Sequence, residues 1–323
     1  MKKLASLLVG LVVLLSVLSL AGCAMGNTSQ GIETPINSDS APGTTPLVQS
    51  DPSENDFSIP LERGLGRFYT GTPTKLLVLM YHNFTTLTQP GAYDRNLTDF
   101  ENDLIYLRDH NITVISLGDM LKIQQGKAPV PAGNIAVITI DDAYTSAYTR
   151  AFPLLKKYQV KATCFLITSF IGEPGRLTWK QVEEMGRYTI KNGKDKLDNN
   201  LVTFGSHTVD HNSLVYDPAV FASRQDYLKF LNMELNQSRK AIEKHTDQQE
   251  MFLSLPYGAG AYDADIINAA KRYGYDGIRT SEFGTLWGAV DLFTVEDYGI
   301  PSLPIFGDTN ISTVQEHFDY LVF

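Results

Sequence analysis

Positive charge is in short supply in this 323-residue sequence, which carries 27 lysines and arginines against 36 aspartates and glutamates. The formal net charge at neutral pH is −9. Proteins that bind nucleic acid or anionic lipid use clusters of basic side chains to neutralise phosphate groups. The shortage of such side chains therefore argues against a nucleic-acid partner and against electrostatic adsorption to a membrane.

Long apolar runs are also scarce. The N-terminal run from Leu7 to Leu20 is shorter than the ~20 residues that cross a bilayer, which disfavours a membrane-spanning helix. Lys2 and Lys3 precede it, as in a secretory signal peptide. The run ends in L-A-G-C at Cys23, which resembles the bacterial lipobox, where cleavage precedes a cysteine that then carries lipid.

This resemblance implies a lipoprotein signal peptide over residues 1–22 and a mature chain tethered outside the cytoplasmic membrane by lipid on Cys23. A plain signal peptide or a membrane helix is the alternative. Without Lys2 and Lys3, 25 basic residues face 36 acidic ones, a balance of −11. The second cysteine of the sequence, Cys164, then has no disulfide partner, and we expect it to be a small buried residue.

Residues 23–67 are rich in Ser, Thr, Pro, Asn, Gly and Asp and contain few large apolar side chains. Such a segment cannot bury enough apolar surface to offset its chain entropy. We therefore expect a lipidated, flexible tether, followed by a single catalytic domain over residues 68–323.

Apolar runs typical of buried strands alternate with helical stretches in this second part. Strands are expected at 76–80, 112–115, 135–140, 162–167, 201–204, 251–255 and 277–280. Capping boxes at Thr98 and Thr178 predict helix starts, and further helices are expected at 224–245, 263–273 and 312–320. The alternation predicts an α/β domain built on a parallel sheet, which is either a closed barrel or an open doubly wound sheet.

Polar side chains directly follow several of these strands. His82 follows the first strand, Asp141 and Asp142 follow 135–140, and His207 and His211 follow 201–204. The carboxyl ends of parallel strands meet at one rim, so we expect these five side chains to converge. Each is ordinary by itself, because an aspartate pair is usually a cap or loop and a histidine is usually packed or exposed. Their joint placement predicts a site.

Two imidazoles and one carboxylate form a common ligand set for catalytic zinc and leave a position for water. The metal would lower the pKa of that water and polarise the carbonyl under attack. One aspartate suffices as a ligand, so the other could act as general base, and a third histidine could protonate the leaving group. The set thus predicts a metal-dependent hydrolase.

Three ordered motifs resemble those of the polysaccharide deacetylases, carbohydrate esterase family 4. The stretch T-I-D-D-A-Y, which ends at Tyr144, is similar to T-F-D-D-G. S-H-T-V-D-H, which ends at His211, matches H-[ST]-x-x-H, and L-P-Y-G, which ends at Gly258, resembles the P-Y-G turn. The earlier V-L-M-Y-H-N-F resembles the branch that de-N-acetylates poly-β-1,6-N-acetylglucosamine in biofilm matrices.

The resemblance implies a distorted (β/α) barrel of parallel strands that hydrolyses N-acetyl groups on an extracellular N-acetylglucosamine-containing polysaccharide. It implies one divalent metal ion. Zinc is favoured, although the same ligands accept cobalt, nickel or iron. It assigns the metal ligands to Asp142, His207 and His211, the general base to Asp141, the general acid to His82, and an oxyanion donor to the backbone N–H of Tyr257.

The sequence departs from the family pattern at several positions. Ala143 stands where the family has glycine, so we expect that turn to avoid backbone conformations that only glycine tolerates. Ser254 stands where an arginine would orient the base, and Arg279 could replace it or form a surface salt bridge instead. Trp287 could stack on a sugar ring or pack as a buried aromatic. His317 is a poor substitute for a late family histidine and is expected at the surface.

Two other functions stay open, and the departures motivate the first of them. One is a non-catalytic, membrane-tethered protein that binds glycan with a degenerate site, which would release no acetate when loaded with metal. The other is an O-deacetylase, whose ester substrate has a better leaving group and would depend less on His82. The sequence does not specify the glycan, its linkage, the metal or the oligomeric state.

Overall fold

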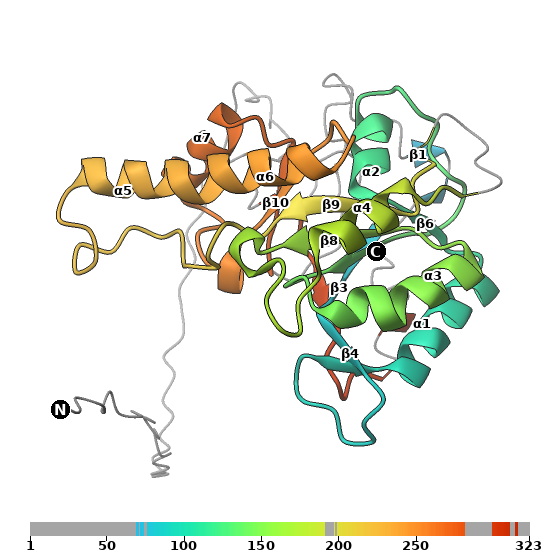
Figure 1. The fold of residues 1–323 in the computed structure, drawn as a ribbon. Coiled ribbons are helices and arrows are strands. Elements are labelled where there is room, and N and C mark those ends of the chain that lie inside the picture. Colours follow the sequence, from blue (N-terminus) through green and yellow to red (C-terminus); the bar gives the residue numbers. More distant parts are fainter. Residues whose placement is uncertain are drawn as a thin grey trace, which may run out of the picture. The chain divides into compact units, whose positions relative to one another are not determined.

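The structure is a computed structural model that describes residues 69–70, 72–73, 76–190, 197, 199–281, 299–310 and 314–315. Its centre is an eight-stranded sheet in which every pair of neighbouring strands is parallel (Figure 1). The strands are β3 (Leu76–Tyr81), β6 (Thr113–Ile115), β7 (Ile135–Ile140), β8 (Ala162–Leu166), β9 (Val202–Ser206), β10 (Phe252–Ser254), β11 (Gly277–Arg279) and β12 (Leu303–Pro304). Their order is β11-β10-β9-β8-β7-β3-β12, with β6 paired to β7.

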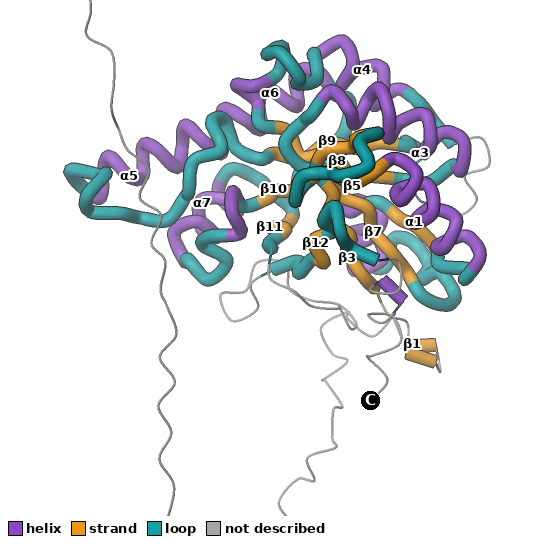
Figure 2. Tube along the Cα trace, turned by 90° about the horizontal axis from the view of Figure 1, so that it is seen from below, coloured by secondary structure: helices purple, strands orange, loops and turns teal. Residues whose placement is uncertain are grey.

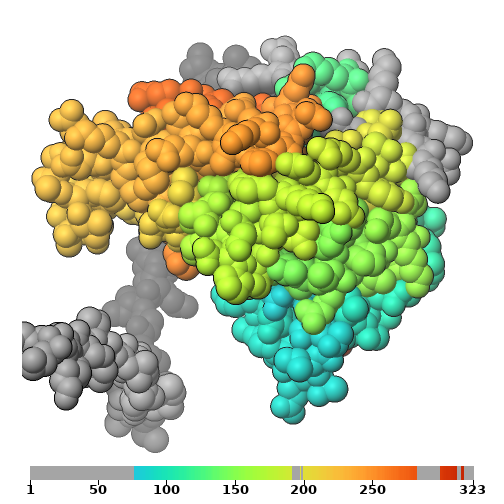
Figure 3. Space-filling model, viewed as in Figure 1, coloured from blue at the N-terminus to red at the C-terminus, as the bar shows by residue number. Residues whose placement is uncertain are grey.

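Helices surround the strands on the outside, as the tube drawn in Figure 2 shows. They are α1 (Leu97–Asp109), α2 (Leu117–Gln124), α3 (Phe152–Tyr158), α4 (Trp179–Arg187), α5 (Arg224–Leu231), α6 (Ser238–His245) and α7 (Ala264–Arg272). Short helical turns are η3 (Ala147–Ala151), η4 (Thr168–Phe170), η5 (Asn232–Gln237) and η6 (Pro256–Gly258). Two further strand pairs form sheets of their own, β1 (Tyr69–Thr70) with β2 (Thr72–Pro73) and β4 (Asn83–Thr85) with β5 (Asp94–Asn96). In the space-filling view of Figure 3, the green α3 and α4 and the orange α6 cover this side of the sheet.

The sheet curves round into a partial barrel. Arg279, at the end of β11, forms a parallel bridge with Ile300. The N–H of Ile300 donates to the carbonyl of Ile278 at 2.8 Å, and β12, which follows Ile300, pairs with β3. The segment around residues 300–304 therefore links β11, at one end of the strand order, to β3 near the other end. This confirms the predicted distorted (β/α) barrel in a single domain and excludes the open sheet.

Both faces of the sheet are buried. In β3, Leu77 and Leu79 belong to the core cluster beneath the helices, while Leu76 and Val78 belong to a second cluster on the other face. Successive side chains of a strand point to opposite faces, so a strand covered on both sides needs an unbroken apolar run. This explains why continuous apolar runs, rather than alternating patterns, marked the strands in the sequence.

The helix starts agree in part with the sequence. Thr178 caps α4 in a complete capping box with Gln181, as expected. The box expected at Thr98 is wrong, because α1 begins earlier and Asn96 is its N-cap, accepting from the N–H of Thr98. The helix expected over 224–245 is present as α5, η5 and α6, with π-helical geometry in η5.

Several sequence predictions fall outside the described residues. They concern the lipidated Cys23, the tether over 23–67, Trp287 and His317. Of the helix expected at 312–320, only residues 314 and 315 are described, and both are helical. Within the described ranges, no helix has the length and apolar character that crossing a bilayer requires.

Candidate active site

The predicted convergence at the strand ends takes place. Asp141 and Asp142 follow β7, and the N–H of Asp141 donates to the carbonyl of Tyr81 at the end of β3. His207 follows β9, and its N–H donates to the carbonyl of Leu166 at the end of β8. Neighbouring parallel strands thus bring residues from distant parts of the sequence to one rim.

Asp142, His207 and His211 form a compact cluster in which the candidate ligand atoms all lie within 4.8 Å of one another. The Nε2 atoms of the two histidines are 3.0 Å apart. Oδ1 of Asp142 lies 3.5 Å from Nε2 of His207 and 3.7 Å from Nε2 of His211. Such a convergence of two ring nitrogens and one carboxylate oxygen has the composition of a catalytic zinc site.

The hydrogen bonds of His207 determine which of its nitrogens is free. Its Nδ1 lies 2.9 Å from the backbone carbonyl of Ser254, and a carbonyl can only accept, so Nδ1 carries the proton. Burial lowers the pKa of His207 to about 3, which keeps the ring neutral. The lone pair of Nε2 therefore points into the cluster, as metal ligation requires.

The carboxylate of Asp142 also fits a bound cation. Its Oδ1 is buried and accepts no hydrogen bond from the described residues. Burial, together with the charge of Asp141, raises the pKa of Asp142, so its ionised form is disfavoured. A divalent ion between Asp142 and the two histidines would offset that cost and give Oδ1 a partner. The three residues therefore fit a metal ion.

The turn after β7 is strained. Asp142 has φ 72° and Ala143 has φ 55°, both in the left-handed region that favours glycine. The expectation that Ala143 would avoid such a conformation is wrong. The turn is stabilised by Arg176, whose Nη1 donates to the carbonyl of Asp142 at 2.6 Å while its guanidinium lies over the ring of Tyr144. These contacts offset a left-handed cost of roughly 1–2 kcal/mol per residue.

Asp141 is the better placed carboxylate for a base. Its Oδ2 accepts from Nη2 of Arg279 and from the hydroxyl of Ser254, while its buried Oδ1 accepts no hydrogen bond within the described chain. Burial alone would raise the pKa of Asp141, but the positive charge of Arg279 and its hydrogen bond are the main opposing influence, and the pKa is lowered. Asp141 is therefore held ionised, with one oxygen fixed and the other open.

Arg279 thus takes the place of the arginine that is absent at Ser254. It has no exposed surface, so the alternative of a surface salt bridge is wrong. Its guanidinium lies 5.2 Å from the ring centroid of Phe165 inside the sheet.

His82 and Tyr257 lie at the edge of the cluster. His82 is half-buried, its Nδ1 has no partner among the described residues, and its ring lies edge-on to Tyr93 at 4.9 Å. His82 directly follows Tyr81, whose carbonyl accepts from the N–H of Asp141, and this places His82 on the same rim. Tyr257 has φ 59°, is 72% exposed, and its ring centroid lies 4.7 Å from that of His211.

Sequence reasoning missed Arg176 and Glu234. Glu234 is completely buried on η5 and accepts hydrogen bonds from the turn that carries His211. In the sequence it reads as one charged residue of an amphipathic helix, and Arg176 reads as a loop residue, so neither carries a local signal. Both act through contacts with segments far away in the chain.

Comparison with known proteins agrees with this geometry. Residues 129–278 match the family model described as polysaccharide deacetylase. The Bacillus subtilis (strain 168) protein YxkH is 29% identical over 270 residues, which cover 83% of this chain and 84% of that protein. The poly-β-1,6-N-acetyl-D-glucosamine N-deacetylase of Staphylococcus aureus (strain MRSA252) is 27% identical over 197 residues, or 59% of this chain and 64% of that enzyme.

The fold has solved counterparts. The structure of the Streptococcus pyogenes deacetylase PplD in complex with acetate superposes with a TM-score of 0.62 at 23% identity. The match covers 76% of this chain and 99% of that chain. The likeness shows a shared fold.

Proposed function

We propose that this chain belongs to the polysaccharide deacetylase family and removes N-acetyl groups from an extracellular N-acetylglucosamine-containing polysaccharide with the help of one divalent metal ion. The observation that carries the proposal is the cluster of Asp142, His207 and His211 beside an ionised Asp141. Zinc is the favoured ion because two imidazoles and a carboxylate are a common ligand set for catalytic zinc.

Different groups at the cluster would carry out the separate steps of amide hydrolysis. An ion held by the three ligands would supply Lewis-acid polarisation of the acetyl carbonyl and activation of water. Asp141 would take the proton of the attacking water on its open Oδ1, because Arg279 and Ser254 hold Oδ2. His82 would protonate the leaving amine, for which its ring nitrogen Nδ1 has no competing partner among the described residues.

The proposed substrate is poly-β-1,6-N-acetylglucosamine. The support is the similarity to the Staphylococcus aureus enzyme named for this polymer, although this chain spans only 64% of that enzyme's length. Exposed Tyr93, packed against His82, and exposed Tyr257, packed against His211, offer aromatic surface on which a sugar ring could rest.

The departures from the family pattern do not favour a non-catalytic protein. Ser254 was one reason to doubt the site, and Arg279 supplies a guanidinium to Asp141. Ala143 adopts a left-handed conformation, which favours glycine but is held here by the surrounding contacts. No described contact favours an ester substrate over an amide.

The proposed location is the outer face of the cytoplasmic membrane, with lipid on Cys23 as the anchor. The support is the L-A-G-C sequence after an apolar run. Partition into a detergent phase that is lost on Cys23→Ala would bear this out. Equal partition of both proteins would contradict it.

The test of function is acetate release by the detergent-solubilised full chain, loaded with zinc or cobalt. The substrates are β-1,6- and β-1,4-linked N-acetylglucosamine oligomers, and Asp141→Asn is the control. We expect release from the β-1,6 oligomer that the control loses. Release from neither oligomer by zinc-loaded protein would contradict the proposal. Selective release from the β-1,4 oligomer would keep the activity and refute the linkage.

A further inference from the structure

Glu234 is a charged side chain that has no exposed surface. It lies in η5, the π-helical turn between α5 and α6. It forms no ion pair with any residue that the structure describes. A buried carboxylate without a cation is costly unless several hydrogen bonds hold it, so its partners indicate what it is for.

The partners of the Glu234 side chain all belong to one turn. Its Oε2 accepts from the backbone N–H of Val209 at 2.8 Å and of Asp210 at 3.0 Å. Its Oε1 accepts from Nδ2 of Asn212 at 3.3 Å. Bonds from N–H groups to a carboxylate are about twice as strong as bonds between neutral groups. Glu234 therefore binds the segment that lies between the two histidines of the cluster.

This turn needs external support. Thr208 has φ 67° and His211 has φ 57°, and each left-handed residue is disfavoured. Local bonds shape its two halves, since Ser206 Oγ accepts from the N–H of Thr208 and Thr208 Oγ1 accepts from the N–H of His211, both at 3.0 Å. Within the described residues, the carboxylate of Glu234 is the charged group that binds the middle of the turn, at the N–H groups of Val209 and Asp210.

The helix that carries Glu234 is itself fastened to β9. The hydroxyl of Ser238 donates to the carbonyl of Glu234 at 2.6 Å and lies 2.7 Å from Oγ of Ser206, the last residue of β9. A π-helical turn changes the direction of the side chains that follow it and is frequent at functional sites. Strand β9, which precedes His207, and the turn that follows His207 therefore both contact one part of the helix, around Glu234 and Ser238.

We propose that Glu234 is a positioning residue for the metal centre. By binding the N–H groups of Val209 and Asp210, it holds His207 and His211 at the spacing that places both Nε2 atoms on one ion. The inference rests on the proposed function, because it requires that an ion binds to this cluster.

The test compares zinc affinity among three full-length, detergent-solubilised proteins by competition with a chromogenic chelator. They are the wild type, Glu234→Gln and Glu243→Gln. Glutamine keeps the shape of Glu234 but removes the charge, so we expect affinity to fall about 10- to 100-fold. Glu243 is an exposed glutamate on α6 whose same substitution should leave zinc affinity unchanged.

Thermal melting separates positioning from a merely structural role. Positioning predicts that Glu234→Gln reduces the rise in Tm that zinc produces, because ligand stabilisation depends on affinity. If this variant lowers the Tm of the metal-free protein but keeps the wild-type zinc affinity and the wild-type rise, the inference is overturned.

A second variant covers the case in which Glu234→Gln does not fold. Asn212→Ala removes only the bond to Oε1 and changes an exposed residue. We expect a smaller loss of zinc affinity, roughly two- to tenfold. Wild-type affinity in this variant would then refute the inference. If the wild type binds no zinc, both the proposed metal dependence and the positioning role are refuted. If the wild type and Glu234→Gln bind zinc equally well, only the positioning role is refuted.

Discussion

Ser254 on β10 and Arg279 on β11 are direct partners in the parallel register of the two strands. Paired residues of neighbouring strands point to the same face of a sheet. Both contact Oδ2 of Asp141, Ser254 through its hydroxyl at 3.3 Å and Arg279 through Nη2. The small serine leaves room for the guanidinium, so the arginine expected on one strand is supplied by the next.

Arg279→Gln is therefore expected to impair catalysis without emptying the metal site. Loss of the guanidinium frees Oδ2 of Asp141 and removes the largest charge that favours its ionised form. We expect kcat to fall by about 10²-fold or more, the scale on which a general base contributes. Zinc affinity should stay within a few-fold of wild type. The matched change on the neighbouring strand, Ser254→Ala, should cost less than tenfold in kcat, and an equal loss in both variants would contradict the role given to Arg279.

Removal of metal should lower thermal stability. Zinc at about 100 times its Kd adds about 2.7 kcal/mol to the free energy of unfolding, which corresponds to a rise in Tm of roughly 5–10 °C. Scanning fluorimetry of protein treated with EDTA and then reloaded measures this rise. His211→Gln, at a half-buried ligand position, should abolish it. His110→Gln, at an exposed histidine far from the cluster in the sequence, is the control and should keep the zinc-dependent rise in Tm. If His211→Gln also keeps that rise, the proposed ligand set is wrong.

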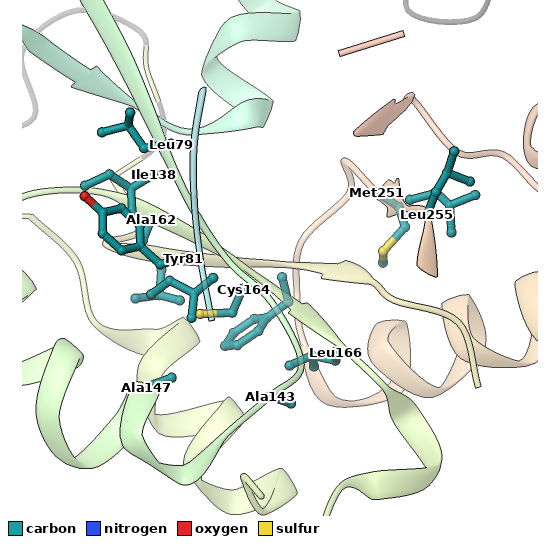
Figure 4. Packing of buried hydrophobic residues seen from close by; sticks show 14 of the residues in the cluster. Leu79, Tyr81, Ile138, Ala143, Ala147, Ala162, Cys164, Leu166, Met251 and Leu255 are labelled. Carbon is teal, nitrogen blue, oxygen red and sulfur yellow. The ribbon is translucent and has the colours of Figure 1, made fainter. Parts of the chain in front are cut away.

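Cys164 should resist thiol reagents in the folded protein. It is buried among Ala162, Leu166 and their neighbours (Figure 4). Burial, with a smaller effect from the charge of Asp141, raises the pKa of the thiol well above its ordinary value. Because the thiolate is the reactive form, reaction with Ellman's reagent at about pH 8 should require unfolding.

The same shift fixes the sign of the pH dependence. A thiol whose pKa is higher in the folded state favours folding below the unfolded value of ~8.5, and this contribution is lost as pH rises above it. Raising the pH should therefore promote labelling through unfolding rather than through a folded thiolate. A Cys23→Ala protein leaves one thiol to count. Stoichiometric labelling of that protein at about pH 8 without denaturant would show that the thiol is accessible.

Gly205→Ala should destabilise the strand that leads to His207. A Cβ at this position would lie 2.6 Å from Cδ1 of Phe165 and 2.9 Å from the backbone oxygen of Phe252. Overpacking of this kind costs about 1–3 kcal/mol, measurable by urea unfolding. Gly186→Ala in α4 is the control, because its Cβ would come no closer than 3.2 Å to a ring atom and alanine favours the helix. Equal stability of the two variants would disprove this steric account.

The sequence predicted best those features that depend on residues close together in the chain. Apolar runs located the strands, and the polar residues after them located Asp141, Asp142 and His207, because a parallel sheet gathers its carboxyl ends at one rim. Arg279 could be suggested but not chosen, since its role depends on the register of β10 with β11.

Glu234 could not be found in the sequence, because its partners lie 22 to 25 residues away across a turn that has no regular pattern. The prediction for the backbone conformation of Ala143 was wrong for a related reason. Residue type alone suggested that the turn after β7 would relax, whereas the Arg176 contact to Asp142 and burial of the alanine hold it in place. Long-range contacts of this kind override local conformational preference.

The left-handed residues of the molecule are unevenly distributed. Seven non-glycine residues of the described chain have positive φ, and five of them, Asp142, Ala143, Thr208, His211 and Tyr257, lie at the active site. Glycine would relieve the strain at Ala143 or Thr208, but it would also give the free chain more conformations to lose on folding. Random mutagenesis selected only for thermostability should therefore produce changes around this rim that cost activity, whereas the helices outside the barrel should yield stabilising changes that leave activity intact.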